Sequence, residues 1–150
     1  MAQLTQYIDE QLILLLDSAS KEEVIKQLVD LAASVKGLPA QETLYQAILE
    51  REQLVSTAIG VGVAIPHAKL PLYHDFFIAV AILHKGVEWN AIDDSLVRIV
   101  FLIGGPDNQQ TEYLKILSSI TKAIRNENLR RKLMHVKSAT AVATLLRGIS

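Results

Sequence analysis

Two almost continuously apolar runs constrain the fold of this chain more than any other feature of its sequence. They are Phe76–Leu83 (FFIAVAIL) and Val97–Ile103 (VRIVFLI). Each is far shorter than the roughly 20 residues of a membrane-spanning helix, and strands of this kind need cover on both faces. The runs Leu12–Leu16 and Ile59–Ile65 predict two further strands. We therefore expect an α/β fold with helices on both sides of a mostly buried sheet.

Helical patterns fall between and after the predicted strands. Ser20 and Glu23 predict a capping box at the start of the first helix, and Gly37 and Pro39 predict its end. Four further helices are predicted over Gln41–Gln53, around Leu114–Ile124, over Glu127–Met134 and over Ser138–Leu146, the last with Ser138 as its N-cap. The chain has 150 residues and no long linker, so we expect a single domain over residues 1–150.

Composition excludes several classes of function. The formal net charge is −1, which argues against nucleic-acid binding through a basic surface. The chain has no cysteine, so disulfides and thiolate chemistry are excluded. The four histidines do not form a zinc-type motif, so we expect no metal, no cofactor and no metal-dependent hydrolase. The N-terminal residues MAQLTQYIDEQ do not resemble a signal peptide, and we expect a cytoplasmic protein without membrane insertion.

The stretch Val61–Pro71 (VGVAIPHAKLP) indicates a reactive histidine. Pro66 restricts the backbone just before His67, at the end of a predicted strand, where α/β sheets usually present reactive groups. A neutral imidazole in this place is able to attack phosphorus as a nucleophile. His84 and His135 lie at a turn-like position and a polar helix end, where structural or surface roles are expected.

Attack on phosphorus requires groups that stabilise the negative charge of the phosphoryl oxygens. Arg51, Ser56 and Thr57 lie upstream of His67 and carry suitable groups. Simpler interpretations remain open for all three. Arg51 has a glutamate on either side and would then be a solvated arginine near a helix end, while the two hydroxyls would form capping or loop hydrogen bonds.

The same region resembles a known family. Leu49–Leu70, with the sequence LEREQLVSTAIGVGVAIPHAKL, resembles the active-site segment of type-2 IIA domains of the bacterial phosphoenolpyruvate-dependent phosphotransferase system, which comprise the mannitol/fructose class and its nitrogen-regulatory branch. The segments SKEEVIKQLVDLAA, GVEWNAIDDSLVRIVFLIGGPDN and EYLKILSSITKAIRNENLRRKL are similar to successive parts of the family. The resemblance covers about Leu12–Leu146, which is nearly the whole chain.

The resemblance implies a mixed β-sheet sandwiched between α-helices in three layers, and a histidine phosphotransferase activity. His67 matches the family's phosphoryl acceptor, which takes its phosphoryl group from phosphohistidine on an HPr-like carrier protein, with Nε2 as the expected acceptor atom. Arg51 matches the arginine that stabilises the phosphate. Ser56, Thr57 and Gly62 match phosphate-binding positions.

Tyr113 is the clear departure from the family pattern. Family members commonly carry a second histidine at this position, beside the phosphorylated one. A tyrosine donates one hydrogen bond but carries no positive charge near neutral pH. The alternative to a phosphocarrier is therefore a non-catalytic interaction module with weakened phosphorylation. A simpler interpretation is that Tyr113 packs on the helix stripe with Leu117 and Ile120.

The segments GVEWNAIDD and EYLKILSSI look most like the nitrogen-regulatory branch, so we expect a regulatory role. The downstream partner would be a IIB domain or a regulated kinase, transporter or sensor, with phosphorylation as the switch. Leu70 and Leu72 are predicted to form a docking patch. Phe76 and Phe77 either extend this patch or lie in the core, and at least one is expected in the core because successive strand residues face opposite sides.

Overall fold

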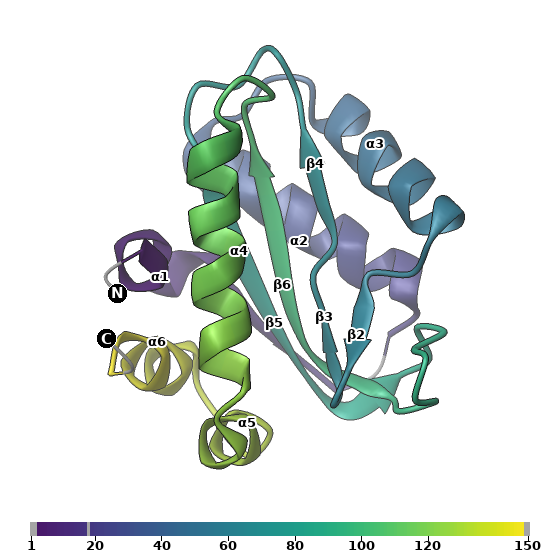
Figure 1. The fold of residues 1–150 in the computed structure, drawn as a ribbon, viewed down its shortest axis with the longest axis vertical. Coiled ribbons are helices and arrows are strands. Elements are labelled where there is room, and N and C mark those ends of the chain that lie inside the picture. Colours follow the sequence, from purple (N-terminus) through teal and green to yellow (C-terminus); the bar gives the residue numbers. More distant parts are fainter. Residues whose placement is uncertain (1–2, 18, 149–150) are drawn as a thin grey trace.

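The computed structural model describes residues 3–17 and 19–148, and a six-stranded sheet lies at its centre (Figure 1). The strands are β1 (Ile13–Leu16), β2 (Ala58–Gly60), β3 (Val63–Ala64), β4 (His67–Lys69), β5 (Phe77–Val87) and β6 (Val97–Gly105). Their order is β1-β5-β6-β3-β2, and β4 pairs with β6 beyond β3. β5 and β6 are antiparallel, whereas β1 is parallel to β5 and both β3 and β4 are parallel to β6. The sheet is therefore mixed, as expected.

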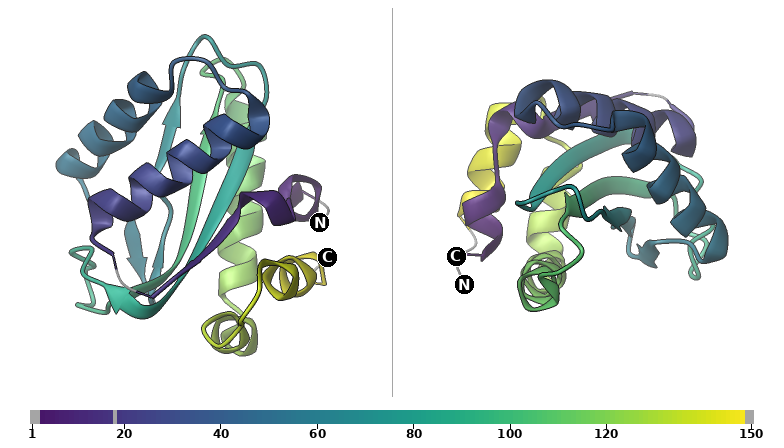
Figure 2. Two further views of the ribbon diagram at one scale, coloured as in Figure 1. Left: turned by 180° about the vertical axis from the view of Figure 1, so that it is seen from behind. Right: turned by 90° about the horizontal axis from the view of Figure 1, so that it is seen from above.

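Helices cover both faces of this sheet. The helices are α1 (Gln3–Tyr7), α2 (Lys21–Lys36), α3 (Gln41–Leu54), α4 (Gln110–Ile124), α5 (Glu127–Leu133) and α6 (Ala139–Arg147). α2 and α3 lie on one face and α4 lies on the other, as the view from above shows (Figure 2). This confirms the three layers. No helix in the described ranges is long and apolar enough to cross a membrane.

Alternate residues of the two long strands fill two separate cores. Ile78, Val80 and Ile82 of β5 belong to the core that includes α4, whereas Ala79 and Ala81 belong to the core under α2 and α3. From Ile99 to Ile103, β6 alternates in the same way between the two cores. Both runs are almost continuously apolar because each strand is covered on both faces, which confirms the interpretation of these runs as buried strands.

The prediction of one strand over Ile59–Ile65 is wrong. The chain instead forms a hairpin, in which β2 pairs antiparallel with β3. Gly60, Val61 and Gly62 all have positive φ angles, of 90°, 51° and 80°, and residues in that conformation cannot continue a strand. The turn is held from outside, because the Val61 amide donates to Oδ2 of Asp93 at 3.0 Å.

A short strand follows Pro66 that the sequence patterns did not predict. Proline has no N–H to donate, so the pairing with β6 is interrupted between β3 and β4. The Pro66 carbonyl still accepts the amide of Ile103 at 3.0 Å, and His67 pairs with Ile103 in register. His67 therefore lies on a strand beside β6, and its backbone is fixed by sheet pairing.

The predicted helix ends are confirmed where a cap defines them. The capping box at Ser20 and Glu23 is present, and Gly37 ends α2 in the left-handed conformation. Ser138 caps α6. The sequence patterns missed α1 and a 3-10 turn over Glu10–Leu12 that leads into β1.

Phe76 and Phe77 are both buried, at 5% and 3% exposure, and they belong to opposite cores. We expect at least one of the two phenylalanines in the core, and the structure places both there. Their rings occupy the space beside the last two residues of β6, where a methyl group on Gly104 or Gly105 would overlap a phenyl ring. The two glycines thus allow the two rings to pack closely against the end of β6, one in each core.

Candidate active site

One ring nitrogen of His67, Nδ1, forms a hydrogen bond within the protein, and the other, Nε2, forms none with the described residues. Its side chain is half-buried at the start of β4, and Nδ1 lies 3.0 Å from the carbonyl oxygen of Ile65. A carbonyl oxygen only accepts hydrogen bonds, so Nδ1 carries the proton of the neutral ring. The lone pair is then on Nε2, which leaves that atom able to act as a nucleophile.

The surroundings of His67 favour the neutral, nucleophilic form of the ring. Its pKa is lowered from the ordinary value of 6.5, chiefly by burial and further by the positive charges of Arg51 and Lys69. The hydrogen bond to Ile65 and the charge of Glu52 act in the opposite direction without reversing the shift. The same two cations that disfavour a protonated ring would attract an incoming phosphoryl group.

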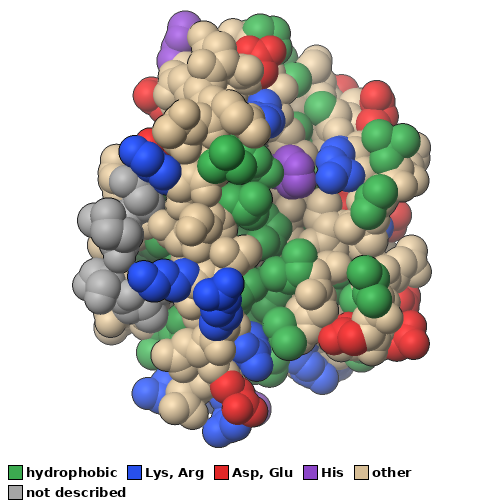
Figure 3. All heavy atoms as spheres, viewed as in Figure 1, with side chains coloured by type: hydrophobic (Ala, Val, Ile, Leu, Met, Phe, Trp, Pro, Cys, Tyr) green, Lys and Arg blue, Asp and Glu red, His purple; other side chains and the backbone are tan. Residues whose placement is uncertain are grey.

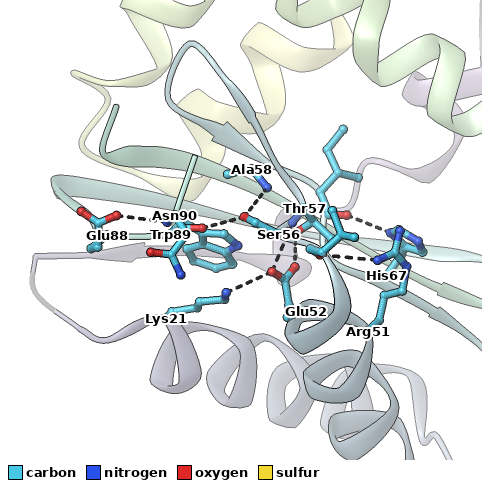
Figure 4. Close-up of polar contacts among 12 residues, drawn as sticks. Lys21, Arg51, Glu52, Ser56, Thr57, Ala58, His67, Glu88, Trp89 and Asn90 are labelled. Carbon is cyan, nitrogen blue, oxygen red and sulfur yellow. Dashed lines mark hydrogen bonds and ion pairs between the residues drawn. The ribbon is translucent and has the colours of Figure 1, made fainter. Parts of the chain in front are cut away.

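Arg51 lies in the last turn of α3 and extends to His67. Figure 4 shows its side chain beside the imidazole ring. The side chain is half-buried, and Nη1 donates to the carbonyl of Val55 at 3.4 Å. Burial lowers the pKa of His67 and the positive charge of Arg51 lowers it further, while the same charge opposes the burial that raises the pKa of Tyr113, so Arg51 acts on both rings. The guanidinium therefore lies where its charge acts on the His67 ring.

Glu52, the next residue, anchors this end of α3 in a buried polar network (Figure 4). Its side chain is only 2% exposed and forms an ion pair with Lys21 of α2 at 3.1 Å. It also accepts the amide of Thr57 at 3.2 Å and the hydroxyl of Thr57. Glu52 therefore joins α2, α3 and the start of β2 at a single point, one residue from Arg51.

The hydroxyls of Ser56 and Thr57 are already used within the protein. Oγ of Ser56 donates to the carbonyl of Trp89 at 2.6 Å and accepts the amide of Ala58 at 3.1 Å. Thr57 is buried and donates to Glu52. Both residues lie close to the site, since the Thr57 carbonyl accepts the amide of Ile65, but in this structure they form the loop hydrogen bonds of the simpler interpretation.

Gly62 is not brought to His67. Val63 pairs with Ile99 of β6 and His67 pairs with Ile103, which separates the two positions by about 13 Å of strand. The Gly62 amide donates to Oγ of Ser95 at 3.3 Å. The glycine therefore serves the turn of the β2–β3 hairpin.

Tyr113, in the first turn of α4, borders His67 on the side opposite α3. The centroids of the two rings are 5.7 Å apart, and the Tyr113 ring also lies 6.2 Å from that of Phe76. Its side chain is buried, and burial raises the pKa of its hydroxyl. Lys69 lies on the same side of the site as Tyr113. Its Nζ is 4.3 Å from the Tyr113 ring centroid and donates to Oε1 of Gln110 at 2.7 Å. Tyr113 thus packs in the core and faces the imidazole.

Comparison with known proteins identifies the family. Residues 6–148 match the family described as phosphoenolpyruvate-dependent sugar phosphotransferase system, EIIA 2. The chain belongs to this family. The family assignment gives the fold and the general role, which is phosphoryl transfer within the phosphotransferase system.

Relatives of this EIIA protein come from both known branches. A nitrogen regulatory protein of Bradyrhizobium diazoefficiens is 32% identical, over 85% of this chain and 82% of the relative. The crystal structure of nitrogen regulatory protein IIA-Ntr from Neisseria meningitidis is similar, with a TM-score of 0.86 and 26% identity over 95% of this chain and 97% of that one. A complex of enzyme IIAMTL and phosphorylated enzyme IIBMTL from Escherichia coli has a TM-score of 0.77 and 27% identity, over 93% and 95% of the chains.

Sequence reasoning missed two residues of the site in this EIIA protein. If the residues after Pro66 form a loop, nothing in the sequence places Lys69 near His67. In a strand, however, positions 67 and 69 lie on the same face. Glu52 is, in the sequence, only a charged neighbour of Arg51. Its burial gives no signal there, because its partners Lys21 and Thr57 meet it only in the folded chain.

Proposed function

We propose that this EIIA protein is a phosphocarrier in which Nε2 of His67 accepts a phosphoryl group from phosphohistidine on an HPr-like protein. The observation that carries the proposal is the 3.0 Å hydrogen bond between Nδ1 of His67 and the Ile65 carbonyl. It holds the proton on Nδ1, so Nε2 keeps its lone pair and the ring keeps one orientation. A freely rotating imidazole would lose this preorganisation.

The transfer exchanges one N–P bond for another. The Nε2 lone pair of His67 forms the new bond to phosphorus while the donor's N–P bond breaks, and that electron pair returns to the donor ring. The donor ring enters protonated on its other nitrogen and leaves as neutral imidazole. His67 keeps its proton on Nδ1, and the positive charge of the phosphorylated ring is supported by the Ile65 carbonyl.

Arg51 and Lys69 supply the charge that this step requires. They approach His67 from different elements, α3 and β4, and both lower its pKa. A guanidinium and an ammonium on either side of the ring would neutralise the oxygens of the phosphoryl group in the transition state and in the product. The electrostatics therefore favour an anionic group at this end of β4.

The donor and the downstream partner would dock on the face that carries His67. Hydrophobic side chains gather on this face between the blocks of polar surface (Figure 3). Exposed apolar residues stand on both sides of the site, with Leu54 at 79% and Val55 at 64% exposure at the end of α3, and Leu114 at 51% on α4. Leu72 is 39% exposed, whereas Leu70 packs partly against the core, so Leu72 is the better docking residue of that pair.

The downstream partner we propose is a IIB domain or a regulated kinase, transporter or sensor. The solved complex of IIAMTL pairs that protein with phosphorylated IIBMTL, and the nitrogen regulatory relatives indicate a signalling role. A dianionic phosphoryl group between Arg51 and Lys69 would change the charge of an otherwise apolar docking face. Partner binding would then depend on phosphorylation.

The alternative function is an interaction module that is phosphorylated poorly because Tyr113 replaces the second histidine. The burial of Tyr113 beside His67 favours it, since the ring whose centroid lies 5.7 Å from that of His67 is neutral, whereas a second imidazole is able to carry a positive charge. The two functions differ in one measurable property, which is whether His67 is phosphorylated at a useful rate.

The deciding experiment is phosphorylation of the purified protein by phosphoenolpyruvate, the first enzyme of the system and HPr, followed by intact-mass analysis. We expect a gain of one phosphoryl group that is lost in acid. It should be absent from His67→Ala and retained in His74→Ala, a matched control because His74 is an exposed histidine outside the site. A gain that persists in His67→Ala would exclude the proposed acceptor. No gain with wild-type protein would leave the interaction module.

A further inference from the structure

Positive charge is concentrated in the C-terminal quarter of the chain. Residues 113–150 contain eight Lys and Arg and one Asp or Glu, whereas residues 1–112 contain seven and fifteen. The formal charges are thus +7 and −8, hidden in an overall value of −1. Figure 3 shows Lys and Arg side chains gathered over α5 and the adjoining end of α4. This part of the surface attracts anions, although the protein as a whole is nearly neutral.

An open hollow of about 860 Å³ lies next to this basic surface. It is formed where the connection from α5 to α6 passes the ends of β1, β5 and β6. Four lining residues are of basic types, namely His84, Arg98, His135 and Lys137. Among the described lining residues, Asp17 is the one carboxylate, and its Oδ1 lies 3.4 Å from Nδ1 of His84.

Arg98 and Lys137 have N–H groups that are available to bind a ligand in this hollow. Nη1 of Arg98 donates to the carbonyl of His84 at 2.6 Å, which fixes the guanidinium while its remaining N–H groups are available. Neither Arg98 nor Lys137 forms an ion pair with a described residue. Arg98 and Lys137 line the same hollow, and guanidinium and ammonium groups are the side chains that proteins use to bind phosphate oxygens.

We propose that this hollow binds an organic phosphate, with the phosphate on Arg98 and Lys137. The rest of the lining is apolar and comes from Leu15, Met134 and Val136. This surface suits the body of a ligand such as a nucleoside. The volume lies within the range of about 300–1,000 Å³ that is typical of small-molecule sites.

The organic-phosphate site is separate from the phosphoryl site. Arg98 is near the start of β6, whereas His67 pairs with Ile103 near its end, about 17 Å further along the strand. The two sites can therefore be occupied at the same time. The organic-phosphate site also does not depend on whether His67 is phosphorylated.

The test is a titration of the full-length, ¹⁵N-labelled protein at physiological salt, followed by NMR. The probes are adenosine 5′-monophosphate, inorganic phosphate and adenosine. We expect the nucleotide to give saturable shifts of the amides around residues 84, 98 and 134–137, inorganic phosphate to bind more weakly at the same place, and adenosine to give no saturable shift. His67→Ala should bind the nucleotide as wild type does, which keeps this test independent of the proposed phosphocarrier function.

Two lysine variants separate a built site from general attraction. Lys137→Gln should weaken nucleotide binding about tenfold, because it removes one charge-assisted hydrogen bond. Lys132→Gln removes the same charge from an exposed lysine that does not line the hollow, and should change the Kd less than twofold. Equal losses in both variants would overturn the proposal in favour of diffuse attraction.

Three further results would also overturn the proposal. Equal binding of adenosine and the nucleotide would show that the phosphate is not recognised. The absence of saturable shifts at millimolar nucleotide would show that there is no site. Displacement of the nucleotide by a short single-stranded oligonucleotide that is equally sensitive to Lys132→Gln would assign the whole α5 surface to nucleic acid.

Discussion

The two walls of the His67 site are built by different physical means. On the α3 side, a buried ion pair and directional hydrogen bonds converge on Glu52 and hold the helix end that carries Arg51. On the α4 side, Tyr113 is held by ring packing against Phe76, and its hydroxyl forms no hydrogen bond with the described residues. Directional polar contacts of this kind fix the position of Arg51, whereas the packing of Tyr113 against Phe76 depends mainly on shape, and the charge on that side comes from Lys69. The α3 wall should therefore be far more sensitive to the loss of a single polar atom.

The largest effect is expected from Glu52→Ala. Removal of one partner of a buried ion pair leaves the other uncompensated, and the Lys21 ammonium and the Thr57 N–H and O–H would lose their acceptor. We expect the free energy of unfolding to fall by about 3 kcal/mol, measured by urea denaturation. Phosphorylation should slow as well, because Arg51 loses the anchor beside it.

Glu50→Ala is the matched control for this variant. Glu50 is an exposed glutamate on the other side of Arg51, and its loss should change stability by less than about 0.5 kcal/mol. A loss for Glu52→Ala as small as that for Glu50→Ala would contradict the polar wall. It would mean that packing alone holds the end of α3.

The second largest effect is expected on the rate of phosphorylation, with little change in stability. Arg51→Ala should slow phosphorylation of His67 by roughly 100-fold, the order expected when a preorganised charge at a reacting oxyanion is removed. Its stability should stay within about 1 kcal/mol of wild type, since Arg51 is half-buried and forms one long hydrogen bond, of 3.4 Å, to Val55. Single-turnover transfer from phosphorylated HPr gives the rate, and urea denaturation gives the stability. Unfolding of the variant would reassign Arg51 to a structural role.

Features that depend on local sequence patterns could be predicted from the sequence, whereas features that depend on contacts between distant residues could not. The buried strands β5 and β6 and the capped helices are local patterns, because apolar runs and capping boxes act on their own segment. The β2–β3 hairpin was missed because its turn places Val61 at positive φ, a conformation that β-branched residues rarely adopt. Asp93 and Ser95 support that turn from 32 and 33 residues away, at Val61 and Gly62. No local pattern reports such support.

The same limit applies to the site. His67 and Arg51 were accessible from sequence because they stand in a contiguous string, and Tyr113 because it departs from a recognisable one. Lys69 would have followed from recognising a strand after Pro66. Glu52 and its partner Lys21 lie 31 positions apart, and nothing in either segment indicates that they meet. The positioning network of the α3 wall is therefore the part of the site that required the structure.

A smaller effect is predicted for the protonation of His67. Its pKa should lie below 6.5 in the folded protein, measured by NMR titration of the ring. Arg51→Ala and Lys69→Ala should each raise it, because each removes a positive charge that disfavours imidazolium, while Lys115→Ala, an exposed lysine on α4, should leave it unchanged. A wild-type pKa at or above 6.5 would contradict the assigned surroundings of the ring.

This shift has a defined consequence for stability. The unfolded chain takes up a proton at His67 near pH 6.5 and the folded chain only at lower pH. His67 therefore contributes no pH dependence above that window, and it destabilises the folded state progressively as the pH falls from 6.5 through the folded pKa. His67→Ala should remove this part of the acid dependence, which urea denaturation between pH 7.5 and 5 would measure on about a one-unit grid.

The smallest effect is expected at the aromatic wall. Tyr113→Phe removes a hydroxyl that has no hydrogen-bond partner among the described residues and keeps the ring against Phe76, so stability should change by less than about 0.5 kcal/mol and the phosphorylation rate less than twofold. Tyr113→His places a second imidazole beside His67 and should raise the rate several-fold if a ring able to carry positive charge is what this site lacks. A slow Tyr113→Phe would assign the hydroxyl to the phosphoryl group. An unchanged Tyr113→His would leave Tyr113 as a packing residue and place the charge of the site entirely on Arg51 and Lys69.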